Sequence, residues 1–391
     1  GSMTTPDNPD SLIDLADAAL DSGDEEAAVA RTSAWLAANP PRADLLHWHA
    51  LLLRALERHD EALEALRQAA RLAPADAAIA RSLAQVSLEA GAKASKLFLD
   101  AIRLAPSRPD LRIGLNSARY AEGEGAAALE ELGAMLAANP GWLEGHRQFA
   151  QLSAMTGQPD RAFDTIEAAL ARFPQAGALY LLALELLGDG ERHEAALQMA
   201  DRALTRLGEA PQLILARAVA LDELRRPEAA PLFTRLGPPA EPGHALRLIR
   251  HQLRQGQIAE AVAAIEPWLS RPDAAPFWSC AALAWRLAQD PRAEWLEAQD
   301  GLVRLVDLGP AKIGVEELAT TLRRLHAGSG RFLDQSVRGG TQTDGPLFAR
   351  TDPAIRRARA VLVDAMADHL AGLPPPDFAH PQLSLRRDRP L

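Results

Sequence analysis

Apolar positions along most of the chain recur with the period of an α-helix. In residues 43–74 they predict two helices that face each other. The first stripe holds Leu46, Ala50, Leu53 and Leu56, and the second holds Ala62, Leu66, Ala69 and Leu72. Because alanine side chains are small, the two helices can approach closely. The pattern therefore predicts a helical hairpin as the structural unit.

This hairpin recurs, and prolines mark its period. Segments such as "RHDEALEALRQAARLAP" and "GEGAAALEELGAMLAANP" share a polar turn, small residues on one helix face and a closing proline. The closing prolines are Pro40, Pro74, Pro106, Pro140, Pro174, Pro211, Pro238, Pro272 and Pro310. A spacing of 34 residues is the most frequent one, and a proline there stops the second helix because it has no N–H to donate. Turns inside the hairpins are expected at Gly23, Gly91, Gly157 and Gly256.

On these residues the chain resembles the tetratricopeptide-repeat family over residues 12–310, as about nine repeats with a shortened seventh at 213–238. The resemblance implies an all-α fold, a helical-repeat solenoid wound into a right-handed superhelix. Stacking is needed because one unit cannot bury its own apolar faces. Residues 311–330 are expected to form a terminal helix and linker, and residues 331–391 a short, partly helical C-terminal extension.

The same resemblance implies a groove for a peptide or protein ligand on the concave face, lined by the first helix of each repeat. The residues placed there are Asp44, His47, Arg54, Ser117, Tyr120, Arg147 and Gln151. The alternative for each residue is a solvated polar position without a ligand.

The uneven charge of the chain argues against a nucleic-acid partner. Its formal net charge is −10, and residues 331–391 hold nine Arg and seven Asp, which leaves −12 on residues 1–330. An acidic solenoid repels phosphate backbones. Only three of the 42 basic residues are lysines, so anions would be recognised by planar guanidinium groups.

Membrane insertion and secretion are not indicated. No run approaches the ~18 apolar residues that a spanning helix needs, and the start of the chain lacks the features of a signal peptide. A cytoplasmic protein without a membrane partner is expected. The single cysteine, Cys280, excludes an internal disulfide and a Cys-based zinc site, and is expected to be a small buried residue.

Motifs for metal or catalytic chemistry are weak. His59, Asp60 and Glu61 have the H-x-D/E form of non-haem iron sites, but they fall at a repeat turn, where a solvated turn is expected. The segment "GEGAAA" at 123–128 fits a loose dinucleotide pattern without a preceding strand. No catalytic residue, metal site or cofactor is predicted in this chain.

After Pro310 the repeat pattern stops. One more helix is expected over 313–326, and another begins at Pro353, with Asp352 as its N-cap. The apolar side of this last helix is expected to pack on the C-terminal repeats. That side holds Ile355, Leu362 and Met366. Alternation at Leu383 and Leu385 is typical of the start of a strand.

Residues 333–381 resemble the opening segment of a bacterial family of 2-oxoglutarate/Fe(II)-dependent oxygenases that carry N-terminal tetratricopeptide repeats. The motif residues are Gln335, Arg338, Gly339, Gly340, Thr341, Gln342 and Thr343, with further matches at Asp334, Ser336, Leu347, Phe348, His380 and Pro381. Such proteins continue into a β-helix domain whose H-x-D and distal His hold iron while an Arg holds 2-oxoglutarate. No residue here matches those ligands, so Fe(II) and 2-oxoglutarate are implied for a longer parent protein.

Two functions remain open at this stage. In one, the chain is the recognition arm of a 2-oxoglutarate/Fe(II) dioxygenase that acts on a peptide or protein. In the other, it is a complete, non-catalytic adaptor, and residues 331–391 cap the last repeat. Whether the parent protein is an enzyme is not decided by these residues.

Overall fold

The computed structural model describes residues 7–327, 330, 333 and 340–389 of the chain. About 70% of the protein is helical, with 21 α-helices and no strand among the described residues. The expected all-α solenoid is confirmed. No described helix is long and apolar enough to span a membrane.

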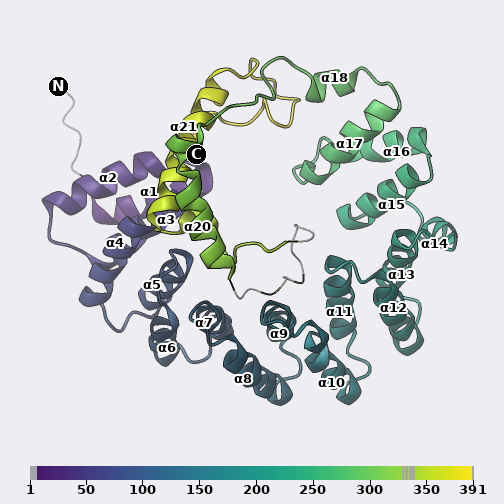
Figure 1. Ribbon diagram of the computed structural model, residues 1–391, viewed down its shortest axis with the longest axis horizontal. Coiled ribbons are helices and arrows are strands. Elements are labelled where there is room, and N and C mark those ends of the chain that lie inside the picture. The colour runs from purple at the N-terminus through teal and green to yellow at the C-terminus, as the bar shows by residue number, and fades with distance from the viewer. Residues whose placement is uncertain (1–6, 328–329, 331–332, 334–339, 390–391) are drawn as a thin grey trace.

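In the described part of the chain, helices α1 to α18 form nine consecutive pairs. The first helices are α1 (Pro9–Ser22), α3 (Ala43–Ala55), α5 (Ala77–Glu89), α7 (Pro109–Ala121), α9 (Leu143–Met155), α11 (Gly177–Asp189), α13 (Pro211–Glu223), α15 (Pro242–Arg254) and α17 (Ala275–Leu287). The second helices are α2 (Glu25–Ala38), α4 (His59–Leu72), α6 (Ser95–Leu104), α8 (Gly125–Ala138), α10 (Asp164–Arg172), α12 (His193–Leu207), α14 (Ala229–Leu236), α16 (Ile258–Ile265) and α18 (Arg292–Glu297). The pairs curve into a ring, with the first helices on its inner side and the second helices outside (Figure 1).

Every pair of the described chain turns at a residue with positive φ, one or two positions after the end of its first helix. These residues are Gly23, Glu57, Gly91, Gly123, Gly157, Glu191, Arg225, Gly256 and Gln289. Glycine adopts this conformation without steric cost, whereas a residue with a Cβ atom is strained there. The four turns expected at glycines are therefore present, and the same turn geometry recurs where the sequence has no glycine.

The prolines fall into two groups. Pro40, Pro74, Pro106, Pro140 and Pro174 each lie two residues beyond a second helix, as expected for closing prolines. Pro211 and Pro310 were expected to close repeats but instead begin helices, because the first position of a helix needs no N–H donor and suits the fixed φ of proline.

The core changes in character along the ring. In the first three repeats it is aliphatic and mostly Leu and Ala, with Ala16, Ala50, Leu52 and Leu66 fully buried. In the last two repeats it is aromatic, with Trp268 stacked on Phe277 at a ring separation of 5.0 Å. Cys280 beside these rings is partly rather than fully buried, and burial raises the pKa of its thiol.

Residues beyond the ninth pair return across the ring. They form α19 (Pro310–Ile313), α20 (Val315–His326), the short 3₁₀ helix η3 (Leu347–Ala349) and α21 (Pro353–Ala371). Helices α20 and α21 lie between the two ends of the solenoid in the view of Figure 1, and Arg356 and Arg359 of α21 bind Glu57 and Asp60 of the second repeat. The C-terminal extension therefore closes the ring.

Two expectations for this extension, the packing of its last helix and the strand at Leu383 and Leu385, are wrong. Helix α21 packs on α19, α20 and the second repeat rather than on the C-terminal repeats, because its arginines bind acidic groups there; Ile355 is buried, but Met366 is 51% exposed. Asp352 is the N-cap residue of α21, as expected, but its side chain makes no capping hydrogen bond and binds Arg324 and Arg350 instead. Leu383 and Leu385 lie in turns rather than in a strand, since Nδ1 of His380 accepts the backbone N–H of Leu383.

Candidate functional site

Two arginines predicted to line the inner groove are bound to the neighbouring repeat. The Arg54 guanidinium on α3 donates to both carboxylate oxygens of Glu89 on α5, at 2.7 and 3.0 Å. Arg147 on α9 binds Glu185 on α11 through two nitrogens, with Nη1 and Nη2 each donating to one carboxylate oxygen at 3.0 Å, whereas Arg54 donates to both oxygens of Glu89 from Nε alone. These arginines therefore connect successive first helices, and a ligand would have to compete with the glutamates.

Other predicted groove residues also bind within the solenoid. Oγ of Ser82 on α5 lies 2.8 Å from His47 Nε2, and burial lowers the pKa of His47, which favours the neutral ring. Ser117 donates to the Ile113 carbonyl oxygen at 3.2 Å. Asp44 accepts two hydrogen bonds from Arg42, which lower the pKa of the carboxyl.

Tyr120, the remaining groove candidate on α7, is half-buried. It packs beside the cluster around Leu129 and Leu132. Its ring also lies so close to Gly125 that a side chain there would collide with it. Tyr120 therefore supports the contact between α7 and α8, and it is not a freely projecting groove residue.

Gln151 and Arg54 differ from the other predicted groove residues because each lines a cavity together with residues of the C-terminal extension. One cavity, of about 290 Å³, is lined by Gln151, Met155, Leu333, Gln342, Thr343, Asp344 and Gly345. A second, of about 470 Å³, is lined by Leu20, Leu51, Arg54, Ala55, Glu57, His59, Glu89, Pro346 and Ala349. The two cavities, with residues 342–349 between them, form what we call the inner-face site. The structure thus brings part of the predicted groove together with part of the predicted motif.

The extension is bound to the inner face through its backbone. The N–H of Gly330 donates to the Met155 carbonyl oxygen at 2.8 Å, and the N–H of Thr351 donates to that of Ala90 at 3.2 Å. A Cβ atom at position 330 would overlap the Ala154 carbonyl oxygen, so only glycine permits this approach. These bonds depend on backbone atoms, and so they would be open to any extended polypeptide.

Arginines of the extension bind where first helices end. Arg356 donates to the Glu57 carbonyl oxygen at 3.0 Å and to Asp60 at 3.0 Å, while Arg359 binds the Glu57 carboxylate at 2.9 Å. Arg386 donates to the Ser22 carbonyl oxygen at 3.0 Å and to Asp24 at 2.7 Å.

Carbonyl oxygens at the C-terminal end of a helix have no partner within it and carry partial negative charge, so cations are favoured there. We call this row of helix ends the acidic rim. It comprises Asp24, Glu57 and Asp60 with the carbonyl oxygens of Ser22, Glu57 and Ala90.

His59 was expected in a solvated turn, but its side chain is buried. Only 2% of the residue is exposed, and its Nε2 lies 3.4 Å from Glu89. Burial alone would raise the pKa of Glu89, but hydrogen bonds from His59 and Arg54 hold it below its ordinary value. An ionised Glu89 therefore lies under the extension at Ala349. The burial of His59 could have been predicted from the helical period, because Ala62 and Leu63 follow it by three and four positions on the same face of α4.

The glycine-rich motif is only partly within the described residues. Gln335, Arg338 and Gly339 lie outside them. Gln342 and Thr343 line the smaller cavity, and Thr341 and Thr343 each place a hydroxyl 2.9 Å from one ring nitrogen of His326. Nothing in the sequence pattern connects His326 with these threonines.

The described residues do not fit an iron site. No group of three or more His, Cys, Asp or Glu side chains in this part of the chain is placed to hold a metal ion.

Comparison with known proteins supports the repeat assignment. Residues 43–76 match the sequence model of the tetratricopeptide repeat family. Together with the nine helix pairs, this match defines a helical-repeat solenoid of tetratricopeptide type. No curated protein matches the chain.

Solved structures of low identity are also similar. A tetratricopeptide repeat protein from Parabacteroides merdae is 18% identical, with 60% of this chain and 94% of that chain covered and a TM-score of 0.38. Yeast Tom70 is 16% identical, with 75% and 67% covered and a TM-score of 0.42. Human IFIT1 with PPP-AAAA is 13% identical, with 65% and 71% covered and a TM-score of 0.30. These overlaps are partial, and no ligand of this chain follows from them.

Proposed function

We propose that this chain is a protein-binding module whose inner face takes a polypeptide segment that carries arginines. One observation carries the proposal: a segment that carries arginines, residues 345–361, already lies on the inner face and the acidic rim, with its residues from Pro353 onward in helix α21. Its backbone bonds to Ala90, and its arginines bind Glu57 and Asp60. A partner with similar chemistry would find the same acceptors.

The charge of the chain supports this choice of partner. Residues 1–330 carry a formal charge of −12, and the rim combines carboxylates with the negative ends of helices. Guanidinium groups suit both acceptors because they donate several hydrogen bonds in a fixed plane. An acidic or neutral segment would leave the rim carboxylates unpaired.

In this structure the extension occupies the site itself. A partner segment therefore competes with an intramolecular one, whose tether gives it a high effective concentration. Weakening the extension should consequently strengthen binding of the partner, which is a testable property of this arrangement.

The test uses the full chain and a fluorescein-labelled peptide of residues 345–361. We expect the variant Arg356→Gln/Arg359→Gln to bind this peptide at least about five-fold more tightly than the unmodified protein does, because its own segment is held less firmly. Fluorescence anisotropy at 50 mM NaCl measures both affinities.

Two matched controls accompany this test. The same peptide with glutamine at 356 and 359 should bind weakly to either protein. Adding Glu57→Gln/Asp60→Asn to the variant should also remove binding, while circular dichroism verifies its helices. Equal affinity for both peptides, or no binding to the arginine-to-glutamine variant, would contradict the proposal.

A finer version concerns the parent protein. The resemblance of residues 333–381 supports a recognition arm that presents a peptide or protein to a 2-oxoglutarate/Fe(II) dioxygenase domain, and the alternative is a non-catalytic adaptor. A longer coding sequence that encodes a H-x-D and a distal His favours the first. Succinate formation from 2-oxoglutarate by the full parent protein, stimulated by the bound peptide, tests it; a stop codon directly after residue 391 would exclude it.

A further inference from the structure

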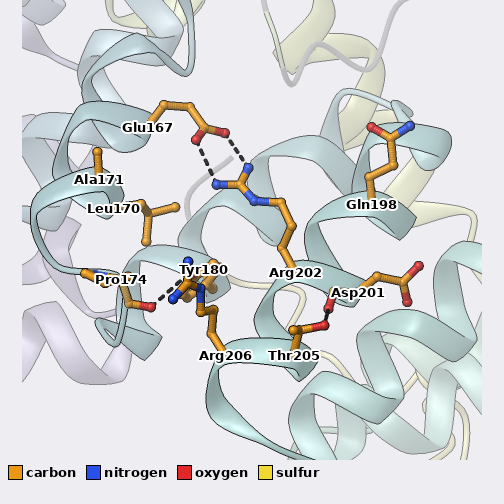
Figure 2. A pocket seen from close by; sticks show the side chains of 10 residues that line it. All are labelled: Glu167, Leu170, Ala171, Pro174, Tyr180, Gln198, Asp201, Arg202, Thr205 and Arg206. Carbon is orange, nitrogen blue, oxygen red and sulfur yellow. Dashed lines mark hydrogen bonds and ion pairs between the residues drawn. The ribbon is translucent and has the colours of Figure 1, made fainter.

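A second cavity system lies on the outer side of the ring, away from the inner-face site. It has a volume of about 630 Å³ and lies between α10, the Pro174 turn, α11 and α12 (Figure 2). Small-molecule sites usually have volumes of roughly 300–1,000 Å³. This cavity therefore has the size of a ligand site, and the proposed function does not use it.

Its charges are paired except for one. Arg202 donates to both oxygens of Glu167, at 2.8 and 2.9 Å, and Asp201 accepts a hydrogen bond from Arg217 at 2.8 Å. Arg206 also lines the cavity, and within the described residues it has neither a hydrogen-bonding nor an ionic partner. One guanidinium group is thus left without a counter-charge.

Apolar groups form the wall near this arginine. The Tyr180 residue is 98% buried, since only 2% of it is exposed, and its hydroxyl donates to the Pro174 carbonyl oxygen at 2.9 Å, which fixes the ring. Leu170 and Ala171 of α10 and the ring of Pro174 continue the wall (Figure 2).

The other polar group without a described partner, Gln198, is two turns away on α12, about 12 Å along the helix axis. Asp201, Arg202 and Thr205 line the cavity between Gln198 and Arg206, and the first two are already paired.

We infer that this cavity binds a carboxylate with an apolar body, the carboxylate on Arg206 and the body against the exposed Ala171 and the partly exposed Pro174, next to the buried Tyr180 ring. A carboxylate matches the fork of a guanidinium through two parallel hydrogen bonds. A single uncompensated positive charge beside Glu167 and Asp201 selects a monoanion over a dianionic phosphate, which these carboxylates would repel. The ligand is either a free carboxylic acid or the C-terminus of a polypeptide that ends in an apolar residue.

The two tyrosines of the chain provide a direct readout. Full-length protein labelled with 3-fluorotyrosine should give two ¹⁹F signals, assigned with the variant Tyr120→Phe. We expect 3-phenylpropanoate to shift the Tyr180 signal and leave that of Tyr120 unchanged, whereas neutral 3-phenylpropanamide should shift neither. In parallel, the peptide Ala-Ala-Phe with a free C-terminus is titrated. Tighter binding of 3-phenylpropanoate indicates a free carboxylic acid as the ligand, and tighter binding of the peptide indicates a polypeptide C-terminus.

Variants at one helix position complete the test. Arg206→Gln should lower the affinity for 3-phenylpropanoate about ten-fold, and Arg206→Lys should retain part of that affinity. The matched control is Arg71→Gln, because Arg71 is likewise the exposed penultimate residue of a second helix and lacks a described partner. An unmoved Tyr180 signal at millimolar carboxylate overturns the inference, as does an Arg206→Gln variant that binds as tightly as the Arg71→Gln control.

Discussion

The two ends of the ring hold the C-terminal extension by different chemistry. At the N-terminal repeats the contacts are ionic and partly exposed: Arg356, Arg359 and Arg386 bind carboxylates and helix-end carbonyls. At the ninth repeat the contacts are buried: His380 has no exposed surface, its Nε2 lies 2.9 Å from the Leu296 carbonyl oxygen, and its ring packs on the edge of Trp295.

This difference assigns the two ends different roles. Charged contacts near water are weakened by salt and exchange readily, whereas a buried, fully hydrogen-bonded group is expensive to release. Nδ1 of His380 accepts the N–H groups of Gln382 and Leu383, so its Nε2 carries the proton and donates to Leu296. We therefore expect the extension to remain anchored at the ninth repeat while it detaches from the first three.

The largest effect is expected from the buried anchor. His380→Ala leaves a cavity and an unpaired Leu296 carbonyl oxygen, and it should lower the free energy of opening of residues 377–385 by roughly 2–4 kcal/mol. Hydrogen exchange of this segment measures the change. Phe378→Ala in the same loop is the control, because Phe378 is 94% exposed. Equal effects of His380→Ala and Phe378→Ala on this exchange would show that the buried His380 contact is not a stronger anchor than the rest of the loop.

Substitutions at the ionic contacts with the N-terminal repeats should destabilise the extension less than His380→Ala does. Arg356→Gln/Arg359→Gln removes two partly buried ion pairs and the bond to the Glu57 carbonyl oxygen, for a combined loss of about 1–2 kcal/mol. Hydrogen exchange should accelerate at Thr351 and along α21 but not at residues 377–383. The unmodified protein in 0.5 M NaCl should change in the same direction. Faster exchange at both ends would show that they open as one unit.

The smallest effect is a pH dependence of the contact with the first repeat. Hydrogen bonds from Arg386 and Ser22 hold the pKa of Asp24 below its ordinary value of about 3.9. Because the folded-state pKa is the lower one, the contribution is complete above the unfolded pKa and is lost as the pH falls through the folded pKa. The radius of gyration from X-ray scattering should rise between pH 5 and pH 3, and Asp24→Asn should show less of this rise. An identical pH profile in both proteins would exclude Asp24 as a cause.

The repeating part of the fold could be predicted because it is local and periodic. Helical stripes and a recurring spacing of 34 residues were enough for the paired helices. The turns were visible only where glycine forms them. At Glu57, Glu191, Arg225 and Gln289 the positive φ is imposed by the stacked helices on either side, and such residues carry no signature of it.

Ring closure could not be predicted in the same way. It depends on single contacts between residues without a shared pattern, such as Thr351 with Ala90, which are 261 positions apart. For the groove, the pattern of polar residues correctly predicted that Arg54 and Arg147 lie on first helices. It did not show that each arginine is bound to a glutamate of the next repeat. A usable signal exists, since their partners Glu89 and Glu185 follow 35 and 38 positions later, about one repeat length.

Closure of the ring also has a consequence for the order of folding. Within the solenoid, contacts join residues of the same or the next repeat, so each helix pair can form as soon as its neighbour exists. The contact between Arg386 and Ser22 joins residues 364 positions apart. The entropic free-energy cost of closing such a loop exceeds the cost for a contact across 35 positions by about 2 kcal/mol. During synthesis from the N-terminus, the first eight repeats can fold before residues 345–389 have been made. The inner face is then open to a partner for the whole of that interval, and the competing segment is present only after residues 345–389 have been made.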